Sequence, residues 1–594
     1  MDATIPAASS RPAPSAAPSP SAVDPETQKM RRQAAEWNVP APALKPLGFA
    51  APGLRSFQPP AWAASSGLIP FEDRWRIGFP DWNRYVNGTP GEYPYRLGRW
   101  WDPYDQNVIK GDYPIWGQHT FFDFTAVSDT IAQFDRTPTA SGVSAQPTPG
   151  FQNFFGGGNE RSLQQNFITS FDLFHGDAGF KPLDWELRFT PVFNVNYLDV
   201  SERGVVNVNP ADGTTRLDGH VGIQELFFQY KLLDLSPNYD FVSARAGIQP
   251  LVSDFRGFIY VDQEPGVRLF GNYDDNKINY NLAFFEQLDK DTNSGLNTVF
   301  RTRGQQVVVA NLTRQDFFFS GYDAQLDFDY NHDAGGFHYD NNGFLVRPAL
   351  VGSVVAHTIN AAYFGLTGQG HIGPIEISHA FYETVGSDSF NQIAGHAVNI
   401  NAQMAALELA YPRDWLTYKV SFFYASGDGN LNSHTATGFD AILDSPDFAG
   451  APFSYWSREG IGLPPTGVAL KSPFSLLPNL RSSELQGQAN FVNPGLLLYN
   501  LGLEARLTPE LTAVVNLNYV QFAAVGVLEQ LLHQNNLSRD MGFDTSVGLI
   551  YRPLLIDNVI FEVGGALFTP DRGFSQIYTS QELYSVFTAM TVTY

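Results

Sequence analysis

The chain has 594 residues, no cysteine, and 60 acidic against 37 basic residues, which gives a formal net charge of -23. The acidic balance argues against nucleic acid as a partner, because phosphate binding needs clustered Lys and Arg, and the absence of cysteine excludes disulfides, thiol catalysis and Cys-ligated metals. Hydrophobic residues make up 43% of the chain, yet no run approaches the roughly 18 apolar residues of a transmembrane helix.

Residues 1–70 are rich in Pro and Ala, beginning "MDATIPAASSRPAPSAAPSPSAVDPE". This start has neither a basic n-region nor an apolar h-region, so we expect no secretory signal in it. Its composition predicts an extended, largely disordered segment.

Residues 71–117 differ from the extension because they are rich in tryptophan, with Gly, Pro and Asp between the rings. We expect an ordered but irregular segment here, acting as a plug or as a periplasmic cap at a barrel mouth. The tryptophans are Trp75, Trp82, Trp100, Trp101 and Trp116.

From about residue 118 to residue 594, apolar and polar residues alternate with a period of two. In "WELRFTPVFNVNY", residues 185–197, the apolar set opposes a polar set that includes Glu186 and Asn194. Each strand of a transmembrane antiparallel β-barrel presents such an apolar set to lipid and the other set to a polar lumen. We predict this all-β fold for residues 118–594, with a water-soluble β-sandwich as the alternative.

The same split in residues 495–520 predicts which side chains face lipid. The stretch "LLLYNLGLEARLT" is followed by a tight "LTPEL" turn and a second alternating strand. The predicted lipid-facing residues are Leu497, Leu501, Leu503, Val515 and Leu517.

Connection lengths give an independent test, because bacterial outer-membrane barrels alternate short periplasmic turns with longer external loops. We predict eight short turns, near 176–184, 233–240, 274–277, 313–316, 369–373, 412–415, 508–510 and 554–558. We predict nine long loops, near 134–162, 201–217, 251–265, 289–304, 331–350, 386–395, 427–494, 524–539 and 570–582. These connections join 18 strands.

The chain ends on an alternating strand, "YSVFTAMTVTY". A last aromatic residue with apolar residues two and four positions before it resembles the signal read by the outer-membrane insertion machinery. Tyr594, Val592 and Met590 fit this signal.

Charged residues of both signs fall on the predicted lumen face. They either pair across strands and brace the wall, or line and tune a conduction path. The candidates are Glu186, Arg188, Arg245, Arg268, Glu504, Arg506, Arg552 and Glu562.

We find no catalytic motif and expect no enzyme activity and no cofactor. His332, Asp333, His338 and Asp340 lie together in "DYNHDAGGFHYDNNG" but lack fixed ligand spacing. We therefore predict no metal site.

Two stretches resemble the alginate-export family of outer-membrane barrels. The first is "RAGIQPLVSDFRGFIYVDQEPGVRLFG" and the second begins "YASGD" at Tyr424. The resemblance covers about residues 220–470 and implies an 18-stranded monomeric barrel. The matching positions are Arg245, Gly247, Gln249, Asp254, Arg256, Gly266, Val267, Arg268, Leu269, Tyr424, Ala425, Ser426, Gly427 and Asp428.

The sequence therefore predicts a barrel in the outer membrane of a Gram-negative-type bacterium, in contact with lipid and lipopolysaccharide. We interpret it as a passive channel for a hydrophilic solute or a polysaccharide, with residues 427–494 as a constriction or lid. The alternative is a structural sheath that holds a periplasmic or lumenal partner, such as a multihaem cytochrome or an export component.

Overall fold

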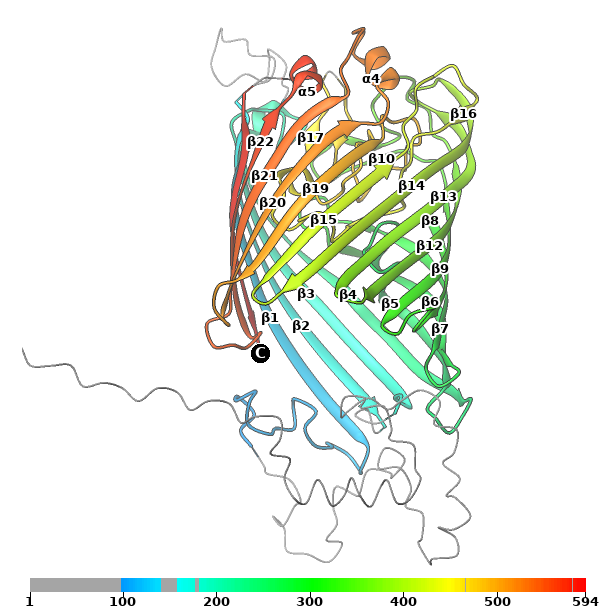
Figure 1. The fold of residues 1–594 in the computed structure, drawn as a ribbon, viewed down its shortest axis with the longest axis vertical. Coiled ribbons are helices and arrows are strands. Elements are labelled where there is room, and N and C mark those ends of the chain that lie inside the picture. Colours follow the sequence, from blue (N-terminus) through cyan, green and yellow to red (C-terminus); the bar gives the residue numbers. More distant parts are fainter. Residues whose placement is uncertain (1–97, 140–156, 177–180, 465, 579–580) are drawn as a thin grey trace, which may run out of the picture. The chain divides into compact units, whose positions relative to one another are not determined.

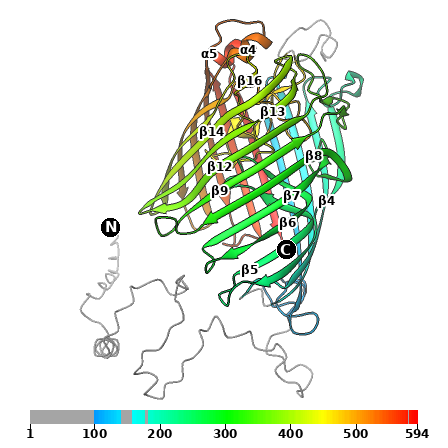
Figure 2. The ribbon, with the colours of Figure 1, turned by 90° about the vertical axis from the view of Figure 1, so that its right-hand side faces the viewer.

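The structure, a computed structural model, describes residues 98–139, 157–176, 181–464, 466–578 and 581–594. Its strands form a closed antiparallel barrel (Figures 1 and 2). The main sheet has 19 strands, of which two-residue β16 only adds to β14 in parallel, so that 18 strands form the wall. The prediction of an 18-stranded transmembrane barrel is confirmed. The predicted extension, 1–70, and residues 71–97 lie outside the described residues.

Each wall strand pairs with the next one along the chain, and β23 pairs with β1 to close the ring. The wall strands are β1 (Thr120–Arg136), β2 (Asn159–His175), β3 (Trp185–Val200), β4 (Thr215–Asp234), β5 (Phe241–Val252), β6 (Val261–Tyr273), β7 (Ile278–Lys290), β8 (Asn297–Arg314), β9 (Tyr322–Asp333), β12 (Ile359–Ile372), β13 (Ile375–Asn391), β14 (His396–Arg413), β15 (Leu416–Ala425), β19 (Leu496–Arg506), β20 (Leu511–Phe522), β21 (Asp540–Tyr551), β22 (Val559–Pro570) and β23 (Leu583–Thr593).

Smaller elements lie in the connections. Among the described residues, no helix is long and apolar enough to cross a bilayer. The small elements are η2 (Pro210–Asp212), α3 (Tyr455–Arg458), α4 (Gly526–Leu531), α5 (Arg572–Ile577), β10 (His338–Tyr339), β11 (Leu345–Arg347), β16 (Thr435–Ala436), β17 (Ile461–Gly462) and β18 (Ala469–Lys471).

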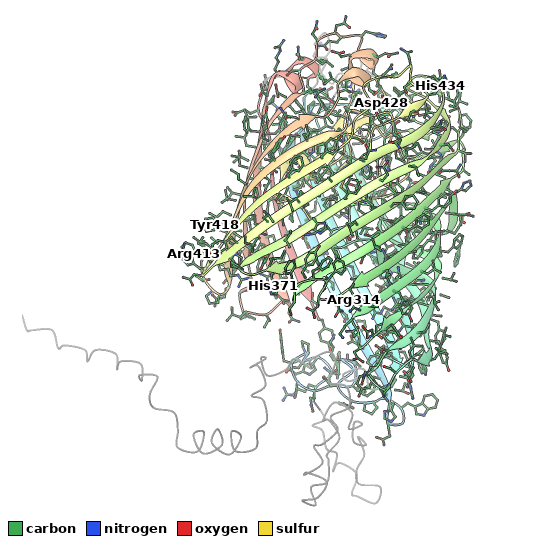
Figure 3. The ribbon with its side chains drawn as sticks, turned by 45° about the vertical axis from the view of Figure 1, so that its right-hand side comes forward. Arg314, His371, Arg413, Tyr418, Asp428 and His434 are labelled. Atoms are coloured by element: carbon green, nitrogen blue, oxygen red, sulfur yellow. The ribbon has the colours of Figure 1, made fainter. Side chains whose placement is uncertain are left out.

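All eight predicted turns and nine predicted loops correspond to connections between the observed strands, with the turns and the loops at opposite ends of the barrel. Figure 3 places Asp428 and His434 at the long-loop end and Arg314, His371, Arg413 and Tyr418 at the short-turn end. Several loops are shorter than predicted, most clearly those at 291–296 and 392–395, because strand pairing continues beyond the predicted strand ends. Apolar alternation ends where a lipid-facing band would end, but backbone pairing can extend beyond it.

Side chains alternate between the outer surface and the lumen as predicted. Leu501 and Leu517 are 59% and 41% exposed on the outside, whereas Asn500 and Asn518 are buried in the lumen. Asn500 Nδ2 donates to Asn518 Oδ1 at 2.6 Å. The wall thus presents an apolar face outward while its backbone groups are paired within the barrel, as a bilayer requires.

The last residue closes the seam between β23 and β1. Tyr594 exchanges two backbone hydrogen bonds with Ala126, and its ring lies 6.1 Å from that of Phe124. Its hydroxyl donates to the carbonyl oxygen of Trp100, and Lys110 Nζ lies 5.3 Å from its ring centroid. Residues 98–117, the described part of the tryptophan-rich segment, therefore contact the end of the chain.

A buried apolar core lies inside the barrel, where residues 426–495, which connect β15 to β19, pack against the inner face of the wall. We call these residues the lumenal segment. Trp456, Leu470 and Phe491 are among its fully buried side chains. The segment packs so closely on the wall that a Cβ at Gly548 or Gly564 would lie 2.3 or 2.7 Å from the Phe453 ring, so glycine is needed at both positions.

Candidate functional site: the charged lumen

The lumenal segment is fixed to the wall by buried hydrogen bonds. Asp544 on β21 accepts from Ser454 Oγ at 2.5 Å and from the backbone N–H groups of Tyr455 and Trp456 at 3.1 Å. The Tyr363 hydroxyl on β12 donates to the carbonyl oxygen of Asp440 at 3.0 Å. Buried polar groups with such partners hold the segment in one position.

A buried ion-pair network lies within the segment. Arg481 Nε donates to Asp440 Oδ2 at 2.8 Å, and Arg481 Nη1 lies 3.0 Å from Glu484 Oε1. Burial raises the pKa of Asp440 to about 6, an effect that the neighbouring Arg481 opposes. Removing the guanidinium would leave two carboxylates buried without their cation, which is strongly destabilising.

Lys471 is a second buried cation of the segment. Its Nζ donates to the carbonyl oxygens of Ser457, Glu459 and Ser472 at 2.9, 2.7 and 2.9 Å. Burial lowers the pKa of Lys471 to about 7. In its protonated form the amine ties three backbone positions together, and it loses its proton close to neutral pH.

The connection between β5 and β6, residues 253–260, also turns into the lumen. Asp254 accepts from the N–H groups of Gly257 and Phe258 at 2.6 and 3.0 Å, which shapes the loop. Arg256 Nη2 lies 3.0 Å from Glu408 Oε1 on β14, and the N–H of Leu443 donates to Ile259 O at 3.0 Å. This inward loop and the lumenal segment therefore support each other.

The lumenal segment is bonded to one side of the lumen. Its hydrogen bonds to the wall are distributed over β1 and over strands between β6 and β21, as at Gln133, Tyr363 and Asp544. Among the described residues, none of these hydrogen bonds reaches β2, β3, β4 or β5. The lumen face of β2–β5 is thus the side on which the segment is not attached.

That free side carries a cluster of charges, which we call the charged wall: Asp172, Glu186, Arg188, Glu225 and Arg245. Arg188 Nη2 lies 2.8 Å from Asp172 Oδ2 and 2.9 Å from Glu186 Oε1, and Arg188 Nη1 lies 3.8 Å from Glu225. Arg245 Nη2 lies 3.7 Å from Glu186 and 2.6 Å from Gln229 Oε1. The structure therefore brings together three of the eight predicted lumen residues, in cross-strand contacts that also brace the wall.

Arg268 has different surroundings although it lies directly opposite Arg245 in the β5–β6 register. Its Nε donates to Asn281 Oδ1 at 2.5 Å, and its guanidinium lies 4.7 Å from the Phe270 ring centroid. Among the described residues, no carboxylate lies within ion-pair distance of it. Arg268 therefore keeps a positive charge that the wall does not neutralise.

The other four predicted residues lie away from the charged wall. Glu504 on β19 pairs with Lys419 at 3.2 Å, and Glu562 lies on the lumen face of β22, in register with Ala589. Arg506 is the last residue of β19 and is exposed. Arg552 follows β21, in a short turn, where its Nε donates to Asp557 at 2.8 Å.

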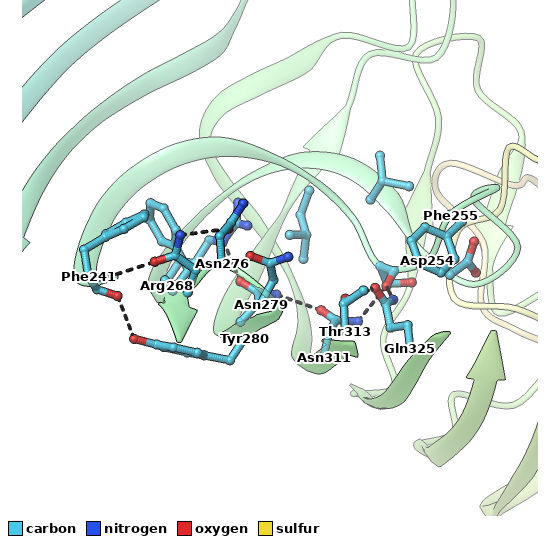
Figure 4. A pocket seen from close by; sticks show the side chains of 17 residues that line it. Phe241, Asp254, Phe255, Arg268, Asn276, Asn279, Tyr280, Asn311, Thr313 and Gln325 are labelled. Atoms are coloured by element: carbon cyan, nitrogen blue, oxygen red, sulfur yellow. Dashed lines mark hydrogen bonds between the residues drawn. The ribbon is translucent and has the colours of Figure 1, made fainter. Parts of the chain in front are cut away.

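A cavity of about 500 Å³ lies beside Arg268, under the inward loop (Figure 4). Asn279, Asn281, Asn311 and Gln325 are among the residues that line it. The lumen residues predicted from the sequence did not include these amides, because only charged residues were considered. The alternation in "INYNLAFF" nevertheless places Asn279 and Asn281 on one strand face, so the signal was present.

Among the described residues, no group of three or more His, Asp or Glu side chains is arranged to hold a metal. In the stretch considered for a metal, Asp333 instead pairs with Arg347 at 2.8 Å. His332 Nδ1 lies 2.7 Å from Asn360 Oδ1, and Asp340 accepts from the N–H groups of Asn342 and Phe344.

No protein-family model and no curated protein matches the chain. Among solved structures, Acinetobacter baumannii OccAB4 is similar with 10% identity and a TM-score of 0.44, over 80% of this chain and 99% of that one. The outer membrane protein OpdK of Pseudomonas aeruginosa also has 10% identity and a TM-score of 0.44, over 79% and 98%. Pseudomonas aeruginosa OccK7 (OpdD) gives 10% and 0.44 over 80% and 98%. Likeness at this level does not assign the chain to a family.

Proposed function

We propose that the chain is a passive outer-membrane channel for a small hydrophilic solute. The main support is the closed barrel with an apolar outer face. Within its lumen, the charged wall on β2–β5 is not bonded to the lumenal segment. Solute passes along the charged wall. The lumenal segment narrows the passage from the opposite side and acts as the constriction.

The arginines of the lumen set the preference for anions. Guanidinium groups keep their charge at any physiological pH, and Arg268 has no carboxylate partner among the described residues. Acidic residues on the outer loops have little influence at this depth, since the Debye length is about 8 Å at physiological salt.

A small solute is favoured over a polysaccharide chain or a partner protein as the occupant of the barrel. The lumenal segment packs against the inner face of the wall in a shared buried core that includes Trp456, and so occupies lumen that a sheath would leave open for a partner. The outer face contacts lipid and lipopolysaccharide, and Met590, Val592 and Tyr594 serve as the signal for the insertion machinery.

Planar-bilayer recording of the purified chain tests the channel. We expect stable conductance steps in KCl, and a membrane that stays silent at high protein load would contradict the proposal. Under a salt gradient, Arg245→Gln/Arg268→Gln should shift the reversal potential toward cation preference.

Arg552→Gln is the matched control, because Arg552 lies in a turn and pairs with Asp557. It should leave the reversal potential unchanged. An unchanged potential in the Arg245/Arg268 variant together with lowered thermal stability would mean that these arginines only brace the wall.

A further inference from the structure

The cavity beside Arg268 has the properties of a ligand site. Its volume of about 500 Å³ falls in the range of small-molecule pockets, and it is formed by the lumen faces of β5–β9 under the inward loop. Figure 4 shows Arg268, Asn279, Asn311 and Gln325 around it. The site therefore lies on the barrel wall, inside the lumen.

A chain of amides fixes the orientation of Arg268. Asn281 Oδ1 accepts from Arg268 Nε, while Asn281 Nδ2 donates to Asn311 Oδ1 at 2.8 Å. Asn311 Nδ2 donates in turn to Asp327 Oδ1 at 2.7 Å and to the carbonyl oxygen of Ser253. Because Nε is the anchored atom, the two terminal amino groups of the guanidinium, which donate to no described residue, are left for a ligand.

The cavity contains no free negative charge to compete for that guanidinium. The one acidic residue that lines it is Asp254, whose carboxylate already accepts from the N–H groups of Gly257 and Phe258 and from the Tyr382 hydroxyl at 3.1 Å. The remaining polar lining is neutral. The Arg268 guanidinium is therefore the one cationic group of the lining, and the one negative charge, on Asp254, is already engaged by the inward loop and Tyr382.

The neutral lining is suited to hydroxyl groups. Asn279 makes no side-chain hydrogen bond to a described residue, while Thr313 and Gln325 bond to each other at 2.7 Å. Amides and hydroxyls both donate and accept, as sugar hydroxyls do. Phe241 and Phe270, with ring centroids 6.2 Å apart, add apolar surface for a carbon skeleton.

We infer that this cavity binds a small polyhydroxylated monocarboxylate and is the selecting subsite of the channel. This inference rests on the proposed function, which it makes more specific. The carboxylate lies against the terminal amino groups of Arg268 in a two-pronged contact, and the hydroxyls bond to the amides. A single arginine favours one negative charge over two.

Titration calorimetry on the full chain in detergent micelles tests the inference, with gluconate, glucose and glycerol 3-phosphate as probes. Gluconate should bind at least tenfold more tightly than glucose and more tightly than glycerol 3-phosphate. Gluconate that does not bind to the folded parent overturns the inference, as does an equal or reversed order of affinities.

Three variants test the assigned residues. Arg268→Gln should weaken gluconate binding at least tenfold and leave glucose binding unchanged, and Asn279→Ala should weaken both sugars severalfold. Arg314→Gln, which removes an exposed arginine paired with Asp274 at 3.1 Å outside the cavity, should change neither. Equal gluconate affinity in parent and Arg268→Gln, each verified as folded by heat-modifiable migration, overturns the assignment.

Bilayer recording distinguishes this inference from the proposed function. Conductance without gluconate binding would contradict the subsite and leave the channel standing. Gluconate binding without conductance would contradict the channel and leave the subsite standing.

Discussion

The barrel wall exposes apolar side chains on its outer face, whereas the lumenal segment buries its apolar side chains in a core that it shares with the inner face of the wall. The wall turns Leu501 and Leu517 outward and asparagines inward, with a regular backbone ladder. The lumenal segment has almost no regular structure and encloses Trp456 and Leu470 in a core. The wall therefore depends on local alternation and on lipid, whereas the segment depends on individual tertiary contacts. We expect the segment to unfold locally while the wall stays folded.

The largest expected effect comes from removing the buried guanidinium of Arg481. Arg481→Ala leaves Asp440 and Glu484 buried without their partner, which should destabilise the segment by roughly 3 to 5 kcal/mol. Hydrogen exchange in peptides covering 455–480 should accelerate while the strands stay protected. As a control, Arg314→Gln, which removes an exposed ion pair, should change the free energy of hydrogen-exchange protection of these peptides by about 1 kcal/mol or less. Loss of protection throughout the wall would contradict the independence of the two regions.

The second prediction concerns a substitution in the wall. Leu501→Arg places a charge on the lipid-facing surface in the middle of β19, and should destabilise the inserted barrel by roughly 2 to 4 kcal/mol if that site lies near the bilayer midplane. Heat-modifiable migration of the reconstituted protein measures it. If Leu501→Arg inserts and resists heat like the parent while Asn500→Leu is the damaging change, the two faces have been exchanged.

The stability of the segment should depend on pH through Lys471. The pKa of Lys471 is lowered by burial to about 7 from its ordinary value of 10.5, so between these pH values the opened segment binds a proton that the closed segment does not. Protection of the segment should therefore rise with pH in this window, by up to about 1.4 kcal/mol per pH unit. Hydrogen exchange of 455–480 at pH 7.5 and 9, with Lys471→Met as the control, measures the slope. If protection depends on pH equally strongly in Lys471→Met, titratable groups other than Lys471 cause the effect.

The smallest expected effect is at the seam. Tyr594→Asp keeps the two backbone hydrogen bonds with Ala126 but removes the ring contacts with Phe124 and Lys110, worth about 1 kcal/mol together, and the hydroxyl bond to Trp100. Insertion should fall severalfold, while inserted molecules conduct normally. Unchanged amounts of folded protein in the membrane fraction, with altered conductance, would place the role of Tyr594 elsewhere.

Alternation in the sequence was sufficient to predict the wall. It placed Leu501 outside and Glu186 inside, and the connection lengths predicted 18 strands. This success has a physical basis, because the pleat of a strand sends neighbouring residues to opposite faces whatever the rest of the chain does. The charged residues on the lumen face of β3 and β5 could be found for the same reason.

Only the tertiary structure decided where the long connections go and what each arginine meets. The length of 427–494 suggested a constriction or lid, but no local pattern specifies its path, because that path depends on contacts between distant residues, such as Tyr363 with Asp440 and Ser454 with Asp544. Arg245 and Arg268 have the same kind of local sequence, yet one has Glu186 nearby and the other faces neutral amides. A period of two specifies the face on which a side chain lies, but its partners come from neighbouring strands and inward loops, whose positions depend on barrel closure and packing.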